Sequence, residues 1–435
     1  MAHLTKSDDI KGVEFAGVGR IGGGYLGVGG QRSGDGLSLD LQFAADKTLT
    51  ARKGPTPVFT RASSATFVGS DGLVQTAATN TPRFDHTSAG VCRGLLIEES
   101  RTNLSLQSEN FASTSWVKQG GSISSVANIE PDGSANSELF SEDGANSTHR
   151  TFQSFTGVSG TSYTLSVFLK FAGRDQIFLE NRSIGTNPFV VFNIQNGTIG
   201  FVSSGLTAAI QAYPNGWYRC SITGTATLAG GNYLIGGYSG GSQSHTGLNG
   251  PAFYLYGAQV EAGSFATSYI PTVASSVVRS ADVCSITGGG FTSFYNSTEG
   301  TLLAQTQKTS TNSNSFIYHA SDVSFNNAID NRYNSATAVQ ALMNVSNVSQ
   351  LTGMNSVTVT AGSSVKQSFA YKLNDCAYSV NGASPILDTL ALIPTVSQMT
   401  IGNAFGGNFH LNGTIAAIRY YRKRLPNAKL VTLTT

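Results

Sequence analysis

Carboxylates are the first residues to test for chemistry, because acid–base catalysis needs two of them close together. Glu98 and Glu99 are adjacent, and neighbouring residues on a strand point to opposite faces of the sheet. We therefore expect surface or salt-bridge roles for this pair, with Arg101 as a partner. The other acidic candidates are scattered among predicted loops, at Glu299, Asp322, Asp330 and Asp388. A retaining glycosidase would need two carboxyl groups roughly 5 Å apart. The sequence thus offers no catalytic residue, and we predict that the protein is not an enzyme.

The histidines and cysteines carry no recognisable metal-ligand motif. The six histidines are isolated, at His3, His86, His149, His245, His319 and His410. No two of them share a ligand spacing such as H-x-x-x-H. The four cysteines are Cys92, Cys220, Cys284 and Cys376. They are too far apart for a zinc motif, and we expect buried or half-buried single thiols. We predict no metal site and no cofactor built from these residues.

Aromatic side chains are the remaining candidates for chemistry, since a rigid ring stacks on the apolar face of a sugar at low entropy cost. We select four possible carbohydrate-binding residues: Tyr238, Trp116, Tyr213 and Tyr318. Tyr238 is the best candidate for exposure, because it lies in the Gly- and Ser-rich loop GGYSGGSQSHTG. Trp217 and Tyr218 are adjacent in NGWYRC, so one ring faces inward and the other outward; we expect Trp217 in the core.

Elements that would position these residues are predicted to be almost entirely strands. Charged residues make up only 12%, Gly is abundant at 50, and no window shows a helical period flanked by caps. Short strands split by Gly, Asn and Ser turns fill residues 104–273, as in a jelly-roll-like sandwich. After a linker over 274–299, alternation resumes and predicts a second sandwich over 300–435. The stretch Pro251 to Thr272 reads as the closing strand of the first sandwich and the exit into the second, since Pro271 ends the strand.

The N-terminal part divides into two pieces. Residues 1–36 are Gly-rich and lack a period, which is typical of a disordered tail or of an extended arm that orders on a partner. As an arm it would anchor through isolated apolar residues at Phe15, Ile21, Tyr25 and Leu26. Residues 37–103 form a short β-rich connecting region that we expect to pack on the first sandwich. The alternating residues of LSLDLQFA begin it.

Charge and hydropathy exclude several partners. The net charge is +2 and the longest basic run is RYYRKR, Arg419 to Arg424, so nucleic acid is not expected as a partner. No apolar run approaches the ~20 residues of a membrane-spanning helix, and we expect no membrane insertion. The first fifteen residues lack the apolar region of a secretory signal.

Several blocks between Leu37 and Val283 carry a family resemblance. They include TRASSATFVGSDGLVQTAATNTPRFDH, GLLIEESRTNL, NGWYRCSIT and YLYGAQVEAGSFATSYIPT, in this order. The blocks resemble a segment that recurs in head spike and tail fibre proteins of tailed bacteriophages. Residues 104–273 are also similar to jelly-roll carbohydrate-binding modules, and AYSVNG followed by HLNGTIAAIRYY resembles laminin-G and concanavalin-like lectin domains. Such domains often hold a structural calcium ion, for which Asp132 with Asp143, or Asp375 with Asn381, could supply ligands.

The resemblance implies a virion structural protein, made in the bacterial cytoplasm and displayed on the head or tail. Its N-terminal arm would bind other virion proteins, and its sandwiches would bind host-surface glycans. Homotrimers are usual in this class. One alternative is a purely structural capsid decoration without host binding. Another is a tailspike that depolymerises capsular polysaccharide at a site formed between chains.

Overall fold

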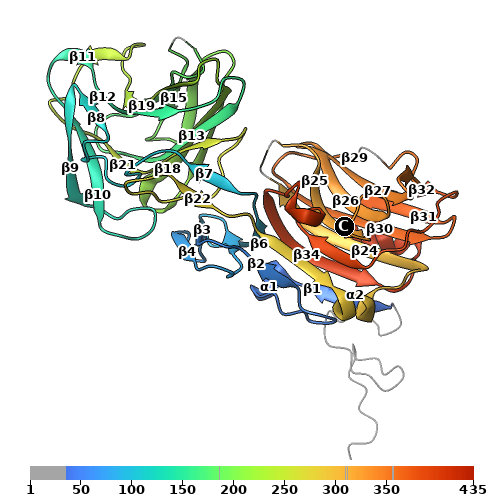
Figure 1. Cartoon of the computed structure of the whole chain (residues 1–435). Helices are drawn as coiled ribbons and strands as arrows, with labels where there is room; N and C mark the ends of the chain where they lie inside the picture. The colour runs from blue at the N-terminus through green and yellow to red at the C-terminus, as the bar shows by residue number, and fades with distance from the viewer. Residues whose placement is uncertain (1–35, 186, 309, 311, 355–356) are drawn as a thin grey trace, which may run out of the picture.

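The computed structural model describes residues 36–185, 187–308, 310, 312–354 and 357–435, and these residues form two β-sandwiches joined at a narrow waist (Figure 1). This confirms the predicted all-β fold class with tandem sandwiches. Helices are short, at α1 (Phe43–Asp46), α2 (Gly288–Phe294) and α3 (Asn427–Thr434). None of the helices among the described residues is long and apolar enough to span a membrane.

The first sandwich has two six-stranded antiparallel sheets. One runs in the order β17 (Thr207–Ala212), β18 (Trp217–Thr225), β13 (Ser162–Phe171), β21 (Gly250–Ala262), β10 (Asn136–Glu142) and β9 (Gly121–Ala127). The other runs β16 (Thr198–Val202), β15 (Phe189–Asn193), β14 (Gln176–Asn181), β19 (Gly230–Gly237), β12 (Arg150–Thr156) and β8 (Val117–Gln119). A two-stranded ribbon of β11 (Asn146–Thr148) and β20 (Ser244–Thr246) lies at one end.

Alternation along these strands builds the core of the first sandwich. In β13, Leu165, Val167 and Leu169 point inward and join one hydrophobic cluster. The long central strand β21 contributes Phe253 and other apolar residues to the same cluster. β21 is the last strand of this sandwich along the chain and lies between β13 and β10, but it ends at Ala262 and not at Pro271 as predicted.

The second sandwich has two eight-stranded sheets. The first contains β32 (Ile386–Asp388), β31 (Cys376–Val380), β30 (Ser364–Lys372), β24 (Glu299–Lys308), β34 (Gly413–Tyr421), β6 (Cys92–Ile97) and β5 (Phe84–His86), with β1 (Leu37–Leu41) also paired to β34. The other contains β2 (Val58–Thr60), β23 (Val283–Thr287), β33 (Gln398–Ile401), β25 (Ser315–Ser321), β26 (Ala328–Ser335), β27 (Ala338–Val345) and β28 (Val348–Ser349), with β29 (Val357–Thr358) paired to β27.

The second sandwich is thus discontinuous in sequence, and this corrects two predicted boundaries. Residues 37–103 were predicted to pack on the first sandwich, but they supply β1, β2, β5 and β6 to the two sheets of the second. The predicted linker 274–299 supplies β23 and α2. The physical reason is burial: Leu39 and Leu41 of β1 and Leu95 of β6 belong to the core of the second sandwich. Alternation in a sequence indicates which face of a strand is buried, but not which sheet the strand joins.

A smaller part of the N-terminal region lies against the first sandwich. The hairpin of β3 (Ala65–Val68) and β4 (Val74–Ala77) places Val68 and Val74 against Trp217 and Tyr269. Beside it, β7 (Arg101–Asn103) pairs with β22 (Val277–Arg279), where the chain passes between the two sandwiches. These two pairs of strands form the waist, and the candidate site lies there.

Candidate functional site

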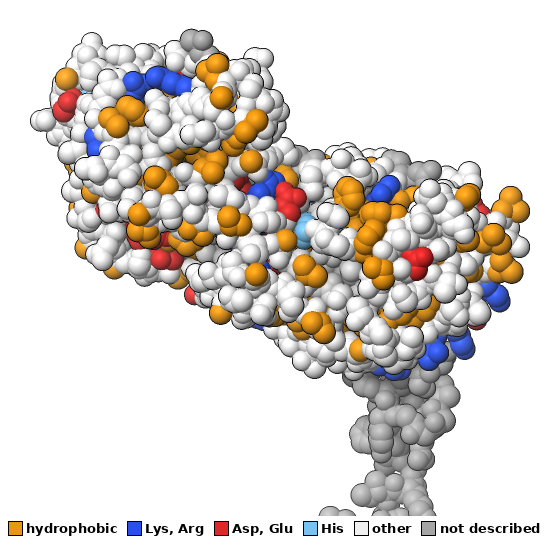
Figure 2. Space-filling view, viewed as in Figure 1, with side chains coloured by type: hydrophobic (Ala, Val, Ile, Leu, Met, Phe, Trp, Pro, Cys, Tyr) orange, Lys and Arg blue, Asp and Glu red, His pale blue; other side chains and the backbone are white. Residues whose placement is uncertain are grey.

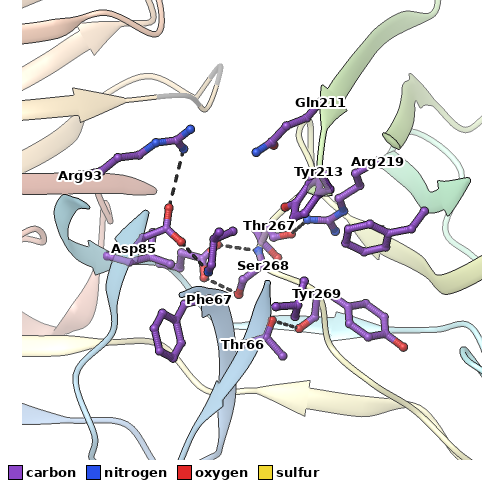
Figure 3. A pocket seen from close by; sticks show the side chains of 16 residues that line it. Thr66, Phe67, Asp85, Arg93, Gln211, Tyr213, Arg219, Thr267, Ser268 and Tyr269 are labelled. Atoms are coloured by element: carbon purple, nitrogen blue, oxygen red, sulfur yellow. Dashed lines mark hydrogen bonds and ion pairs between the residues drawn. The ribbon is translucent and has the colours of Figure 1, made fainter. Parts of the chain in front are cut away.

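A polar cavity of about 120 Å³ lies at the waist, where three parts of the chain meet (Figure 3). One wall is the β3–β4 hairpin, which contributes Phe67. A second wall is the β5–β6 hairpin, which contributes Asp85 and Arg93. The third wall is the first sandwich, which contributes Gln211 and Arg219. The side chains of Arg93 and Gln211 enter from opposite sides and point toward one another across the cavity (Figure 3).

Further hollows adjoin this cavity and extend it into a groove. A hollow of about 50 Å³ shares Asp85 and Arg93 with the cavity and continues to Gln307. Another of about 330 Å³ shares Arg93 and Gln307 and lies over the outer face of the second sandwich. On the other side, a hollow of about 280 Å³ shares Gln211 and Arg219 and runs along β17 and β18. Because the hollows share lining residues, we describe them together as the waist groove.

Asp85 and Arg93 form the charged edge of the waist groove. Asp85 Oδ1 accepts the backbone N–H of Val68 at 2.9 Å, whereas Oδ2 lies 3.7 Å from Arg93 Nη1. Burial raises the pKa of Asp85 to about 6, against the opposing effects of the Val68 hydrogen bond and the Arg93 charge. Arg93 Nε is buried and has no hydrogen-bond partner in the described part of the chain. The Arg93 side chain is nevertheless 24% exposed and that of Asp85 11%, so both groups can still contact a ligand in the cavity.

The opposite edge is built on β17 and β18. Arg219 donates from Nη1 to the Thr267 carbonyl at 2.8 Å and from Nη2 to Ser166 Oγ at 2.9 Å. Its guanidinium lies over the Phe168 ring at 5.4 Å, which fixes it in place. Tyr213 packs edge-on against Phe168 with ring centroids 5.0 Å apart, and burial raises the pKa of the phenol. These contacts give the groove a rigid wall.

A buried ion network forms the floor beneath the groove. Glu98 accepts salt bridges from Arg83 at 2.8 Å and Arg279 at 2.7 Å. Asp282 pairs with Arg61 at 3.1 Å and also with Arg83 at 2.5 Å. Figure 2 shows acidic and basic side chains side by side at the surface of the waist, whereas the residues of this network lie beneath the surface.

The salt-bridge role expected for the Glu98–Glu99 pair is confirmed, but Glu98 does not lie at the surface. Its side chain is buried, and Arg101 pairs with the neighbouring Glu99 at 2.5 Å. Burial alone would raise the pKa of Glu98. The charges of Arg279 and Arg83 and the hydrogen bonds from Ser268 outweigh burial and hold this pKa at about 2. Glu98 is therefore an ionised structural group with little capacity left for a ligand.

Of the four aromatic candidates, the structure brings only Tyr213 to the waist groove. Trp116 is 1% exposed, packs on Phe111 and donates its indole N–H to the Gln107 carbonyl, so its ring has no free face. Tyr318 is fully buried in the second core. Both corrections have the same cause: each ring faces inward on its sandwich and fills core volume. Trp217 is buried, as expected.

Tyr238 lies apart from the groove, on the outer face of the sheet that contains β14, β15 and β19. It is half-buried and packs at 5.9 Å from Phe189, which in turn packs at 4.9 Å from the exposed Phe201. Tyr238 is therefore part of a second, more apolar surface.

The remaining predicted residues are placed as follows. The anchoring candidates Phe15, Ile21, Tyr25 and Leu26 lie outside the described residues. For the suggested calcium ligands, Asp143 contacts His149 at 3.1 Å, and Asp375 pairs with Arg424 at 2.8 Å.

The sequence did not point to Asp85, Arg93, Gln211 or Arg219. Asp85 and Arg93 flank a hairpin, but the residues opposite them lie more than a hundred positions away. The spacing of residues along the sequence therefore could not show that Arg93 and Gln211 face one another across a cavity.

No protein-family model matches this chain, and no curated protein does. Among solved structures, the chain is similar to the Ruminococcus gnavus IT-sialidase CBM40 bound to α2,3-sialyllactose, at 14% identity and a TM-score of 0.27 over 32% of this chain and 84% of that one. Domain 4 of the Geobacillus stearothermophilus arabinanase AbnA matches at 12% identity and a TM-score of 0.28, over 39% and 82%. Mouse laminin α1 domains LG4-5 match at 12% identity and a TM-score of 0.22, over 65% and 88%. At these values the similarities assign neither a family nor a ligand.

Proposed function

We propose that this chain is a glycan-binding structural protein, displayed as a spike or fibre on the virion of a tailed bacteriophage. The waist groove is the observation that carries the binding part of this proposal. The order of sequence blocks described above supports the phage part, together with the tandem sandwiches expected of such a protein.

The chemistry of the waist groove suits a neutral polyhydroxylated ligand. Its walls present guanidinium, amide, carboxyl and hydroxyl groups, among them Arg93, Gln211, Asp85 and Thr207. Planar groups of this kind can bind neighbouring sugar hydroxyls with paired hydrogen bonds. Phe67, Tyr213 and Phe265 add aromatic surface. The length of the groove, from one sandwich across the waist to the other, favours an oligosaccharide over a single sugar.

Binding without cleavage fits the groove better than hydrolysis. Glycoside hydrolysis uses two carboxyl groups with separate roles. Asp85 could serve as an acid, but Glu98 is held by Arg83, Arg279 and Ser268 and has little capacity left to act as a nucleophile or base. We therefore place the chain among binding proteins, with depolymerisation as an outcome of the test.

Display on a virion would raise the affinity of weak sites. In a homotrimer, three grooves could engage one polysaccharide surface, and linked sites gain avidity without new contacts. The N-terminal arm would hold the particle while the two sandwiches face the host.

The test uses the purified full chain and intact particles. We expect the chain to bind host-surface polysaccharide without releasing reducing ends, and a labelled antibody to mark the outside of the particle in negative-stain electron microscopy. Label on the particle without polysaccharide binding would favour a capsid decoration. Release of reducing ends would establish a depolymerase. No label on the particle would contradict the virion assignment.

A further inference from the structure

Two histidines that are far apart in sequence meet beside a buried carboxylate at one end of the first sandwich. Glu142 ends β10, His149 lies between β11 and β12, and His245 lies in β20. All three are buried, and one ring nitrogen from each histidine and one oxygen of Glu142 lie within 4.8 Å of one another. The imidazole centroids are 4.8 Å apart. The ribbon that brings His149 and His245 together lies at the end of the sandwich away from the waist (Figure 1).

Each polar contact in this cluster joins a ring nitrogen to a carboxylate oxygen, and either a hydrogen atom or a cation must lie between the two atoms. His245 Nε2 lies 3.4 Å from Glu142 Oε1, and His149 Nε2 lies 3.1 Å from Asp143 Oδ1. A proton on each ring could fill this role, and so could a cation. The second nitrogen of each ring, Nδ1, is buried and has no hydrogen-bond partner among the described residues. Buried polar atoms without a partner call for an explanation, such as a bound ion or an ordered water.

Three hydrogen bonds hold the Glu142 carboxylate in a fixed orientation. Arg174 donates to both of its oxygens, at 3.0 Å from Nε and 2.5 Å from Nη2, and the Leu248 N–H donates to Oε2 at 3.0 Å. A carboxylate has about four lone-pair sites, so the one left faces His245. Hydrogen-bonded carboxylates of this kind are typical around bound metals.

Two glycines leave the space that an ion and its ligands would need. A Cβ atom at Gly237 would lie 2.4 Å from Glu142 Oε1, and one at Gly247 would lie 2.5 Å from His149 Nε2. A side chain at either position would therefore collide with these groups. The glycines keep the backbone close to the cluster without filling it.

We propose that Glu142, His149 and His245 bind one divalent transition-metal ion, with zinc as the first choice. Two imidazoles and a carboxylate are ligands that suit zinc, whereas calcium and magnesium prefer oxygen alone. Ligand atoms on a tetrahedral zinc ion, each ~2.1 Å from the metal, lie roughly 3.4 Å from one another. The candidate ligand atoms here lie within 4.8 Å of one another, so small side-chain rotations that move them by about 1 Å would form the site. Asp143, with a side chain 51% exposed, can supply a fourth ligand from the solvent side. The ion would fasten the β11–β20 ribbon to the sandwich.

The test is isothermal titration of the untagged, chelator-treated full chain with zinc chloride. We expect one zinc ion per chain, a rise in Tm on binding, and no comparable effect of calcium or magnesium. His245→Asn should weaken zinc binding by more than about 100-fold, the upper end of what loss of an outer partner costs. His319→Asn is the matched control, because His319 is also buried beside a carboxylate, Asp330, but in the second sandwich.

Two further measurements keep the proposal testable if the core variants do not fold. Asp143→Asn changes an exposed side chain and should weaken zinc binding by about 10-fold. Cobalt bound to the unaltered protein should show intense visible absorption bands typical of four-coordinate sites. Failure of the stripped protein to bind zinc, or stoichiometric zinc binding that survives in a folded His149→Asn/His245→Asn double variant, would overturn the proposal.

Discussion

Glu98 Oε2 lies 2.7 Å from Arg279 Nη1, and both side chains are buried at the waist. Glu98 directly follows β6, a strand of the second sandwich, whereas Arg279 ends β22, on the segment that leaves the first sandwich. Arg83 joins the same carboxylate from the β5 side at 2.8 Å. The floor of the waist groove is therefore an ion network that ties the two sandwiches together.

Removing the negative charge of Glu98 should destabilise the protein strongly. Glu98→Gln leaves the buried Arg279 without a carboxylate partner, whereas Arg83 keeps Asp282. A buried charge that loses its partner costs about 3–5 kcal/mol in comparable cases. The adjacent Glu99 is the matched control: its side chain is 33% exposed and pairs with Arg101, so Glu99→Gln should cost about 0–1 kcal/mol. Calorimetry of both variants gives the comparison. Similar Tm values for the two would contradict the structural role of Glu98.

Acid should weaken the waist in a defined pH window. The pKa of Glu98 is about 2 in the folded chain, below its ordinary value of 4.5, because Arg279 and Arg83 outweigh the opposing effect of burial. A lowered carboxyl pKa contributes stability that is present above the unfolded pKa and lost as the pH falls through the folded pKa. We expect the Tm to decline between pH 4.5 and 2, with a shallower decline in Glu98→Gln. Parallel declines would show that other carboxylates dominate.

The discontinuous second sandwich predicts how fragments behave. A fragment of residues 300–435 lacks β1, β2, β5, β6 and β23, so its core is open and it should not fold. A fragment of residues 104–273 contains both sheets of the first sandwich and should fold alone. Circular dichroism and amide chemical-shift dispersion distinguish the two. A folded 300–435 fragment would mean that the N-terminal strands are dispensable.

The aromatic residues chosen from sequence should separate into structural and surface groups. Trp116→Ala opens a cavity in the first core and should cost about 3–5 kcal/mol in the free energy of unfolding. Tyr238→Ala removes a half-buried ring from an outer face and should cost much less. Denaturant titration measures both. Equal losses would place Tyr238 in the core instead.

The sequence predicts strands well because alternation directly reports burial. Short strands were expected throughout residues 104–273, and β14 and β15 are two of the strands found there. The strand with which each of them pairs was harder to predict. Leu39 lies in the second core because β1 pairs with β34, which is almost four hundred positions away, and nothing in LSLDL specifies that partner. The linker was misjudged for the same reason, since Ile286 is buried against the second core.

The site was harder to predict than the fold because its parts are distant in sequence. Tyr213 was selected as an aromatic side chain that could stack on a sugar, but Arg93 and Gln211 become neighbours only when the sandwiches meet. The histidine cluster illustrates the same limit. His149 and His245 are isolated in sequence, and the pairing of β11 with β20 brings them together.

Glycan binding should depend on pH through Asp85. Burial raises the pKa of this carboxyl group to about 6, so it ionises as the pH rises through that value. An ionised carboxylate accepts stronger hydrogen bonds from sugar hydroxyls than a neutral acid does. We therefore expect affinity to increase as the pH rises through about 6, and Asp85→Asn to remove this dependence. The check is titration calorimetry across this range. A pH profile unchanged in the variant would exclude Asp85 from the site.

Glycan binding at the waist groove can be tested by calorimetric titration of host-surface oligosaccharide into the full chain and into the Arg93→Ala and Tyr238→Ala variants. Arg93 enters the waist groove, and Tyr238 lies on the separate aromatic face. We predict that Arg93→Ala loses binding at unchanged Tm while Tyr238→Ala binds normally. Loss of binding in Tyr238→Ala with full binding by Arg93→Ala would contradict it and move the site to the aromatic face.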